Sequence, residues 1–274
     1  MMPKTVTLIR HGESESNLAK DLAEQGMPHP NEADLMRRHT SERRLTPLGV
    51  EQAQAAGMWI HAWILKNRIA PTECRLYVSP YIRTLETSGH MQIKGRRWRP
   101  DSRIVERNWG QMDQLTYKER AERYGDTMGL RKEHALFWRP GGDGETMLGV
   151  LVRYRDLVDT MHRECENMHV IVVTHGELMW AARYVHEYWM PYDLRDAMLH
   201  RTSQTDMHNC RIIQYSRLRE DGTEGQRLER VRLVDPMTPA DPTRNLDWTP
   251  IARRLYSSDE LLEFVEKYRR HLYL

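Results

Sequence analysis

The stretches TVTLIRHG, residues 5–12, and HVIVVTHG, residues 169–176, decide the fold. Each begins with β-branched and apolar residues, a composition typical of a buried strand, and each ends in a His-Gly pair. In open α/β sheets, ligands bind beyond the carboxyl ends of the strands. The pattern therefore predicts that His11 and His175 lie at comparable strand ends.

Helices are predicted between and after these strands. Thr46 is a suitable N-cap before Pro47, and residues 50–65 are apolar or small over much of their length. Further predicted elements are helices at residues 80–90, 116–124, 130–138 and 146–166, and strands at residues 75–79, 207–215 and 228–234. This alternation predicts an α/β fold, a three-layer α/β/α sandwich with a mainly parallel central sheet and helices on both faces.

The 274 residues suffice for one large domain, and no linker is visible. We assign residues 1–235 to this domain. Residues 18–44 form a lid or rim insertion across the mouth of the site, or a plain surface excursion. Residues 236–274 begin with a proline-rich stretch and include a capped helix after Ser257, so we expect an arm that packs on the domain or on a partner.

Composition excludes several classes of protein. Net charge is +2 with basic and acidic residues interspersed, which does not indicate a nucleic-acid partner. No apolar run approaches the roughly 18–20 residues that span a bilayer, and the N-terminus lacks the pattern of a signal peptide. Cys74, Cys165 and Cys210 have neither metal-ligand nor disulfide spacing. We expect a cytoplasmic protein without membrane contact.

Arginines cluster at residues 37–44 and 96–99. A solvated basic face explains both clusters, and a rim that attracts anionic substrates explains them as well.

Several residues at the predicted strand ends suit phosphoryl transfer to a side chain. That chemistry needs a nucleophile and cationic donors around the phosphoryl oxygens. A neutral imidazole of His11 is a suitable nucleophile, while Arg10 and Asn17 offer donors beside it. Arg83 lies about one turn into the helix after the second strand, and His175 can stabilise charge on the transferring group.

Six motifs in order resemble those of the histidine phosphatase, or phosphoglycerate mutase-like, superfamily. They span most of residues 5–215, and their order is more specific than any one of them. The motifs are RHGESESN (10–17), TPLG (46–49), VSPYIRTLETS (78–88), VERNWG (105–110), PGGDGET (140–146) and VVTHGE (172–177). Asn209-Cys210-Arg211 resembles a late motif of the plant and fungal phosphoglycerate mutase-like proteins.

The resemblance implies roles for particular residues. His11 becomes phosphohistidine, and Glu106 acts as general acid and then as general base. Arg10, Arg83 and His175 form the phosphate pocket, with Asn17 and Gly176 beside it. Trp109, which follows the acid motif, either lines this pocket or packs in the core. Neither a metal nor a cofactor is implied.

Departures from the mutase pattern favour a phosphatase that acts on a phosphorylated small molecule. Where mutases carry a lysine after the acid motif, this chain has Tyr117, although Lys118 is adjacent, and Arg131-Lys132 is the only nearby basic pair. A phosphoglycerate-type mutase and a non-catalytic scaffold that binds a phosphorylated ligand remain alternatives. Substrate identity is open, and so is a homodimer.

Overall fold

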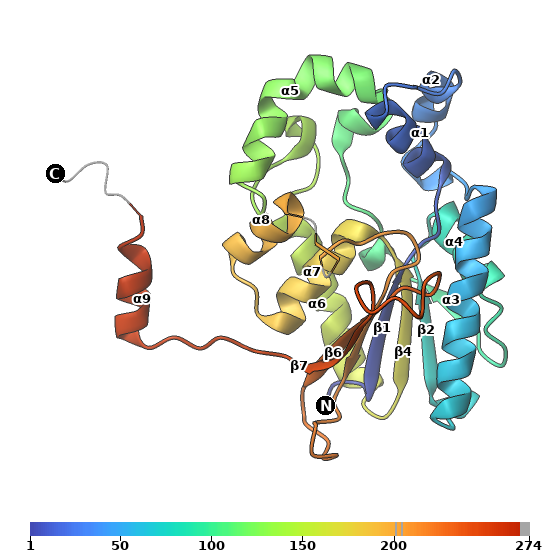
Figure 1. Ribbon diagram of the computed structural model, residues 1–274, viewed down its shortest axis with the longest axis vertical. Helices are drawn as coiled ribbons and strands as arrows, with labels where there is room; N and C mark the ends of the chain where they lie inside the picture. Colours follow the sequence, from blue (N-terminus) through green and yellow to red (C-terminus); the bar gives the residue numbers. More distant parts are fainter. Residues whose placement is uncertain (201, 204, 269–274) are drawn as a thin grey trace.

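The computed structural model describes residues 1–274 except 201, 204 and 269–274, and its centre is one sheet (Figure 1). Within the described residues the sheet has seven strands in the order β3-β2-β4-β1-β5-β6-β7. The strands are β1 (Thr5–Arg10), β2 (Cys74–Val78), β3 (Trp98–Pro100), β4 (His169–Thr174), β5 (Ile212–Ser216), β6 (Arg230–Val234) and β7 (Leu246–Pro250).

The sheet is mixed, and its parallel half holds the predicted site. Strands β3, β2, β4 and β1 run parallel, whereas β5, β6 and β7 each run antiparallel to the preceding neighbour. Parallel neighbours need long crossovers, and helices supply them here. The predicted α/β fold is confirmed, and the two strands that end in His-Gly pairs are direct parallel neighbours.

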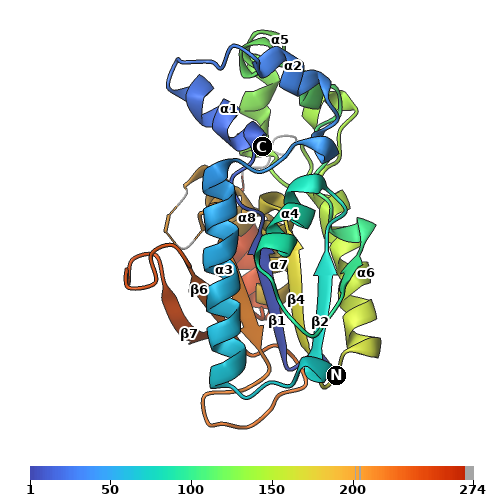
Figure 2. The same ribbon diagram turned by 90° about the vertical axis from the view of Figure 1, so that its right-hand side faces the viewer.

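Helices cover both faces of the sheet (Figure 2). Helices α3 (Pro47–Lys66) and α4 (Ile82–His90) lie on one face, and α6 (Met147–Glu164) and α7 (Gly176–Glu187) lie on the other, with α8 (Pro191–Leu199) beside α7. Side chains of β1 alternate between the two cores: Val6 and Leu8 pack with α6 and α7, and Ile9 packs with α3. No described helix has the length and apolar character needed to cross a membrane.

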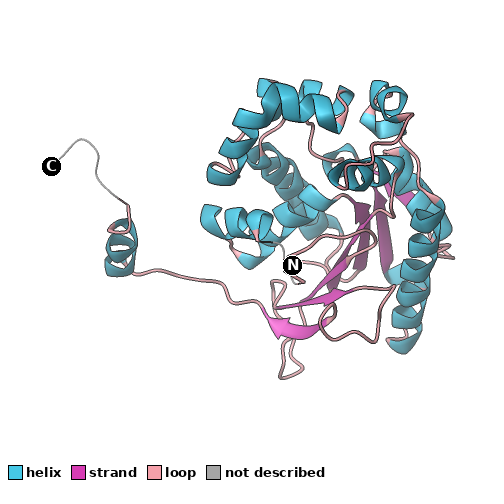
Figure 3. Cartoon of the chain, turned by 45° about the horizontal axis from the view of Figure 1, so that its top comes forward, coloured by secondary structure: helices cyan, strands magenta, loops and turns pink. Residues whose placement is uncertain are grey.

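A helical cap lies beyond the carboxyl ends of β1, β2 and β4 (Figures 1 and 3). We define the cap as α1 (Glu15–Glu24), α2 (Glu32–Arg37) and α5 (Tyr117–Glu133). Its parts are bonded to one another, because the Tyr117 hydroxyl donates to the Ser16 carbonyl at 3.2 Å and the Tyr117 amide donates to buried Glu32 at 2.7 Å. Residues 18–44 thus lie over the sheet edge that carries His11.

Several elements differ from the predicted ones, and helices α1, α2, α7 and α8 were not predicted. Residues 117–133 form one helix, because Gly125 and Gly129 keep helical backbone angles where two helices were predicted. Strands β3 and β7 were not predicted; both lie at sheet edges, and their side chains are half-buried or exposed, so neither has an apolar pattern. Strand β7 lies within residues 236–274 and is followed by an extended segment and helix α9 (Ser258–Val265).

The backbone after β1 crosses the start of α3 at very close range. A Cβ atom added to Gly49 would lie 2.0 Å from the Glu13 carbonyl oxygen, and one added to Gly12 would lie 2.2 Å from the Gly49 carbonyl oxygen. Backbone atoms cannot move aside as a flexible side chain can. Only glycine fits at both positions, and this contact holds the loop that carries His11 against α3.

We predict that Gly49→Ala lowers the free energy of unfolding by about 3 kcal/mol, since a methyl group would push two backbone segments apart. Urea unfolding measures the change. Gly89→Ala is the matched control, because Gly89 lies in α4 with no atom within 4 Å of its added Cβ; it should stabilise the protein by about 0.5 kcal/mol. Equal effects of the two substitutions would contradict this packing account.

Candidate active site

Three neighbouring strands end at one edge of the sheet and bring the predicted residues together. Arg10 pairs with Thr174 and Val78 pairs with Val173 in the strand register, so His11, Ser79 and His175 follow at the same level. The His11 amide donates to the Thr174 carbonyl at 2.9 Å, and the Ser79 amide donates to the Val173 carbonyl at 3.0 Å. The ring centroids of His11 and His175 are 5.2 Å apart.

Hydrogen bonds determine which nitrogen of His11 carries a proton. The Nδ1 atom lies 2.7 Å from the Gly12 carbonyl oxygen, which only accepts, so Nδ1 carries the hydrogen. Arg83 Nε lies 3.2 Å from His11 Nε2 and can only donate. The lone pair is therefore on Nε2. Burial lowers the pKa of His11 well below its usual 6.5, and Arg83 and Arg10 lower it further, which keeps the ring neutral.

The loop around His11 is fixed from both sides. The Gly12 amide donates to Thr87 Oγ1 on α4 at 3.0 Å. The His11 carbonyl accepts from the Cys210 amide at 3.2 Å and from Asn209 Nδ2 at 3.1 Å. These contacts leave the imidazole little freedom to turn.

His175 is a buried neutral ring with one partnered nitrogen. Its Nε2 lies 2.8 Å from Ser79 Oγ, and the Tyr81 ring packs against it at 5.1 Å between centroids. The Nδ1 atom is buried and has no hydrogen-bond partner among the described residues. Burial, Arg83 and His11 lower the pKa of His175 well below 6.5. An unpartnered buried nitrogen beside His11 is suited to contact a ligand.

Two arginines place positive charge at the histidines. Arg83 is buried at the start of α4, and besides its contact with His11 it donates to the Thr40 carbonyl at 2.6 Å. Thr40 belongs to residues 18–44, so this predicted insertion is bonded directly to the site. Arg10 donates to the Met207 carbonyl and contributes to the lowered pKa of both histidines.

Two carboxyl groups, those of Glu106 and Glu177, interact electrostatically. Burial raises the pKa of Glu106 to about 7, and the negative charge of Glu177 adds to the increase. Arg83, the Arg107 amide, which donates to Glu106 at 3.0 Å, and Arg10 oppose it. A carboxyl group with a pKa near 7 can both donate and accept a proton at neutral pH.

A family model described as the histidine phosphatase superfamily (branch 1) matches residues 6–217. The chain belongs to the histidine phosphatase superfamily. Members of the superfamily include phosphatases and mutases.

Two curated relatives support the assignment. The chain is 29% identical to the phosphoglycerate mutase-like protein AT74 of Arabidopsis thaliana over an alignment of 193 positions that covers 64% of this chain and 55% of that protein. It is 27% identical to a 2,3-bisphosphoglycerate-dependent phosphoglycerate mutase of Rhizobium meliloti, covering 64% of this chain and 75% of the relative. The chain thus spans little more than half the length of the Arabidopsis protein.

Solved structures share the fold. A mycobacterial glucosyl-3-phosphoglycerate phosphatase in complex with VO3 aligns with a TM-score of 0.59 at 21% identity, covering 78% of this chain and 92% of that one. A phosphoserine phosphatase of Entamoeba histolytica aligns with a TM-score of 0.55 at 18% identity, covering 81% and 93%. Both likenesses support the phosphoglycerate mutase-like fold.

The remaining predicted site residues are Asn17, Gly176 and Trp109. Asn17 caps α1, where its Oδ1 accepts from the Ser14 amide at 3.1 Å and from Asn209 Nδ2 at 3.1 Å. Gly176 begins α7, and a Cβ added there would lie 3.6 Å from Arg10 Nε. Trp109 donates to Glu177 at 2.9 Å and lies 5.8 Å from the Trp138 ring. Their roles toward a ligand remain predictions.

A cluster around Glu177 was not anticipated from the sequence. Glu177 lies inside the motif VVTHGE, but no role was predicted for it. Its carboxylate accepts from Arg107 at 3.3 Å and from Arg131 at 3.1 Å, in addition to Trp109. Arg131 belongs to α5 and stacks over the Trp109 ring at 4.9 Å, so Glu177 links the cap to the sheet edge. Three distant segments meet here, and no local pattern reveals it.

We predict that Glu177→Gln lowers the pKa of Glu106 below 7, because it removes the neighbouring negative charge. Carbon-13 NMR of the labelled glutamate carboxyl groups measures the titration, and loss of the signal in Glu106→Gln assigns it. Unfolding should also cost about 3 kcal/mol less, since Arg107 and Arg131 lose a charged partner.

The control is Glu187→Gln. Glu187 lies on the same helix and pairs with Arg183 at 2.9 Å, away from Glu106. It should lower stability while leaving the pKa of Glu106 at about 7. If Glu106 titrates with the same midpoint in Glu177→Gln and in Glu187→Gln, the proposed coupling is contradicted.

Proposed function

We propose that this chain is a phosphomonoesterase that hydrolyses a phosphorylated small molecule through a phosphohistidine on His11. One observation carries the proposal: the buried, neutral His11 ring has its Nε2 lone pair 3.2 Å from Arg83 Nε and its ring 5.2 Å from that of His175. Membership of the histidine phosphatase superfamily supports it, as do two phosphatases of the same fold.

In the first step, His11 Nε2 attacks phosphorus and the bond from phosphorus to the ester oxygen breaks. Glu106 in its acid form donates a proton to the leaving oxygen, so an alcohol departs. Arg83, Arg10 and the second histidine, His175, stabilise charge on the phosphoryl oxygens. A pKa of about 7 leaves a substantial fraction of Glu106 protonated at neutral pH.

In the second step, Glu106 is a carboxylate and removes a proton from water. The water oxygen attacks phosphorus, the bond from phosphorus to His11 Nε2 breaks, and inorganic phosphate leaves. Glu106 is then protonated and His11 again has its lone pair. Arg83 and Arg10 supply the positive charge in this scheme, and neutral His175 supplies a hydrogen-bonding group, so we expect no requirement for a metal ion.

A mutase is the second candidate, favoured by the 27% identity to a bacterial phosphoglycerate mutase. Tyr117 occupies the place of the mutase lysine. It packs inside the cap, where the Arg120 guanidinium lies 4.7 Å from the centre of the Tyr117 ring. Arg131 is held by Glu177. Incubation with 3-phosphoglycerate and a bisphosphate primer distinguishes the candidates: release of phosphate faster than isomerisation supports the phosphatase, and the reverse supports the mutase.

We predict that His11→Ala lowers the turnover of p-nitrophenyl phosphate by at least about ten-thousand-fold, because no nucleophile replaces the imidazole. Steady-state kinetics with and without a chelator measure it, and the wild-type rate should not change with chelator. His169→Gln is the control, since His169 lies at the opposite end of β4 and bonds Thr5 at 2.9 Å. Activity retained in His11→Ala would overturn the proposal.

We predict that kcat/KM for an alkyl phosphate falls about tenfold per pH unit above pH 7, as Glu106 loses the proton that the leaving group needs. His11 stays neutral over this range because its pKa is well below 6.5. p-Nitrophenyl phosphate should show a shallower fall, because its leaving group needs less protonation.

The Glu106→Gln variant tests whether Glu106 causes the fall in kcat/KM above pH 7. It should remove the pH dependence above pH 7 and slow the alkyl phosphate about a hundredfold or more, with a smaller effect on the aryl phosphate. An unchanged profile in Glu106→Gln would assign the titration to another group.

A further inference from the structure

Helix α9 has an apolar face that the described residues leave largely uncovered. Leu261, Leu262, Phe264 and Val265 fall on one side of the helix, and none of its residues is buried. Ser257 caps it with Glu260 in a capping box, so the helix has its own start signal. Figures 1 and 3 show α9 at the end of an extended segment that leaves the sheet after β7.

The start of this arm is held on α8. Arg254 donates to the Tyr192 hydroxyl at 3.0 Å and pairs with Asp193 at 3.6 Å. The Tyr192 and Tyr256 hydroxyls are 3.3 Å apart. Phe264, at one edge of the apolar face, packs on the Tyr192 ring at 5.5 Å. These contacts orient α9 on α8 and leave Leu261, Leu262 and Val265 exposed.

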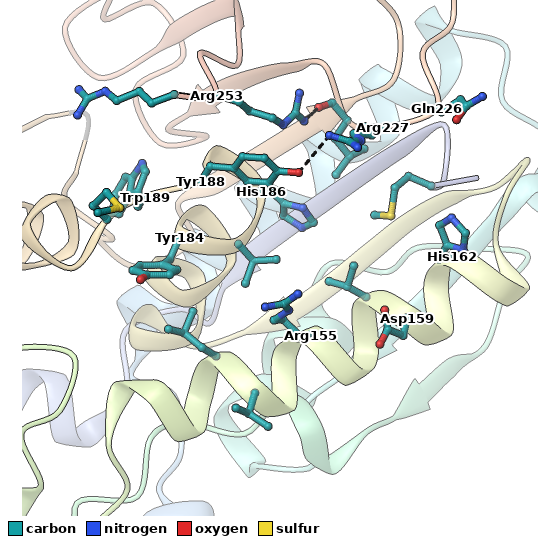
Figure 4. Close-up of a pocket in the computed structure, with 18 of the residues that line it drawn as sticks. Arg155, Asp159, His162, Tyr184, His186, Tyr188, Trp189, Gln226, Arg227 and Arg253 are labelled. Atoms are coloured by element: carbon teal, nitrogen blue, oxygen red, sulfur yellow. Dashed lines mark hydrogen bonds between the residues drawn. The ribbon is translucent and has the colours of Figure 1, made fainter. Parts of the chain in front are cut away.

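A groove of about 1130 Å³ lies along the outer side of α6 (Figure 4). Its lining includes Leu148, Val152, Arg155 and Val158, which follow one another at intervals of three or four residues on α6. Tyr184 and Trp189 form the facing wall from the α7 side. From residue 148 to residue 162 the groove follows α6 for about 21 Å, and α9 is about 12 Å long. The helix therefore fits within the groove.

The charges of the groove and of α9 are opposite. Four arginines line the groove, against a single carboxylate, that of Asp159, among its described residues. Arg253 pairs with Glu229 at 3.4 Å and Arg254 with Asp193 at 3.6 Å. Arg155 and Arg227 have no ion-pair partner among the described residues, and Arg227 donates to the Tyr188 hydroxyl at 3.2 Å. Helix α9 with Glu266 at its C-cap carries four acidic residues and no basic one. Acidic side chains flank the apolar face of α9, where they would meet the arginines of the rim.

We propose that the groove on α6 binds helix α9 of a second copy of this chain, and that two copies exchange their arms reciprocally. A two-fold axis makes both contacts identical and closes the assembly as a dimer. The mode is that of an amphipathic helix in an apolar groove. The proposal does not depend on the reaction at His11, because the groove lies along α6 and neither His11 nor His175 lines it.

The chain's own α9 does not suit the groove. Arg254 and Tyr256 line the groove at its edge while they also hold Tyr192. Only Ser257 separates Tyr256 from α9. With so short a connection, α9 would have to give up the contact of Phe264 with Tyr192 to turn back along α6.

Sedimentation velocity over a range of concentrations tests the dimer in the full chain. We expect the wild type to dimerise, and both Val152→Asp and Leu262→Asp to weaken the dimer at least about tenfold, because each puts a charge into the apolar contact. These side chains are 63% and 64% exposed, so neither change should disturb the monomer. Met58→Asp is the matched control, since Met58 is 68% exposed on α3 and should leave the dimer unchanged.

Disulfide trapping identifies the occupant of the groove. When Val152→Cys and Leu262→Cys proteins are mixed and oxidised, the proposal predicts a mixed covalent dimer, and mixing Met58→Cys with Leu262→Cys should give none. The native cysteines are all buried. The proposal would be overturned by a wild type that stays monomeric, or by a dimer that neither Val152→Asp nor Leu262→Asp weakens. It would also be overturned if a chain that carries both Val152→Cys and Leu262→Cys formed the disulfide within itself.

Discussion

A neutral imidazole held beside buried Arg83 and partly buried Arg10 is the constraint on which the rest of the site depends. Protonated His11 would add a third positive charge to a space from which water is largely excluded, and the ring stays neutral for that reason. The Gly12 carbonyl then holds the proton on Nδ1, and Arg83 faces the lone pair on Nε2. The close contact of Gly12 with Gly49 keeps that carbonyl in position.

The two carboxyl groups of the site, those of Glu106 and Glu177, differ in chemistry. Glu106, which interacts with Arg83 and Arg10, has a pKa near 7 and can exchange protons at neutral pH. Glu177 instead accepts hydrogen bonds from two arginines and an indole, and its charge acts on Glu106. Arg131 and the Thr40 carbonyl come from the cap side, so the position of the cap and the electrostatics of the site are linked.

Much of this arrangement could be predicted from sequence, for reasons that differ between residues. Residues 5–12 and 169–176 contain local signals for buried strands, and neighbouring parallel strands must end at one edge, which brings His11 near His175. Glu106 follows only from the family resemblance, since nothing in its own segment shows that it becomes buried. The pairing of Glu177 with Arg107 could not be predicted without the fold, because it joins segments 70 residues apart. Strand β7 was missed because a half-exposed edge strand such as Leu246–Pro250 has no apolar alternation.

The central claim is that a phosphoryl group is transferred to His11 during turnover. Rapid quenching without acid, using a substrate with a labelled phosphoryl group, tests this claim most directly. The account predicts a labelled protein that is stable in base and labile in acid, with the label mapping to the peptide that contains residue 11. The label should accumulate further in the Glu106→Gln protein with an aryl phosphate, since hydrolysis of the intermediate then lacks its base. Turnover by the wild type and by Glu106→Gln with no labelled protein at any time, or label on any other residue, would contradict the account.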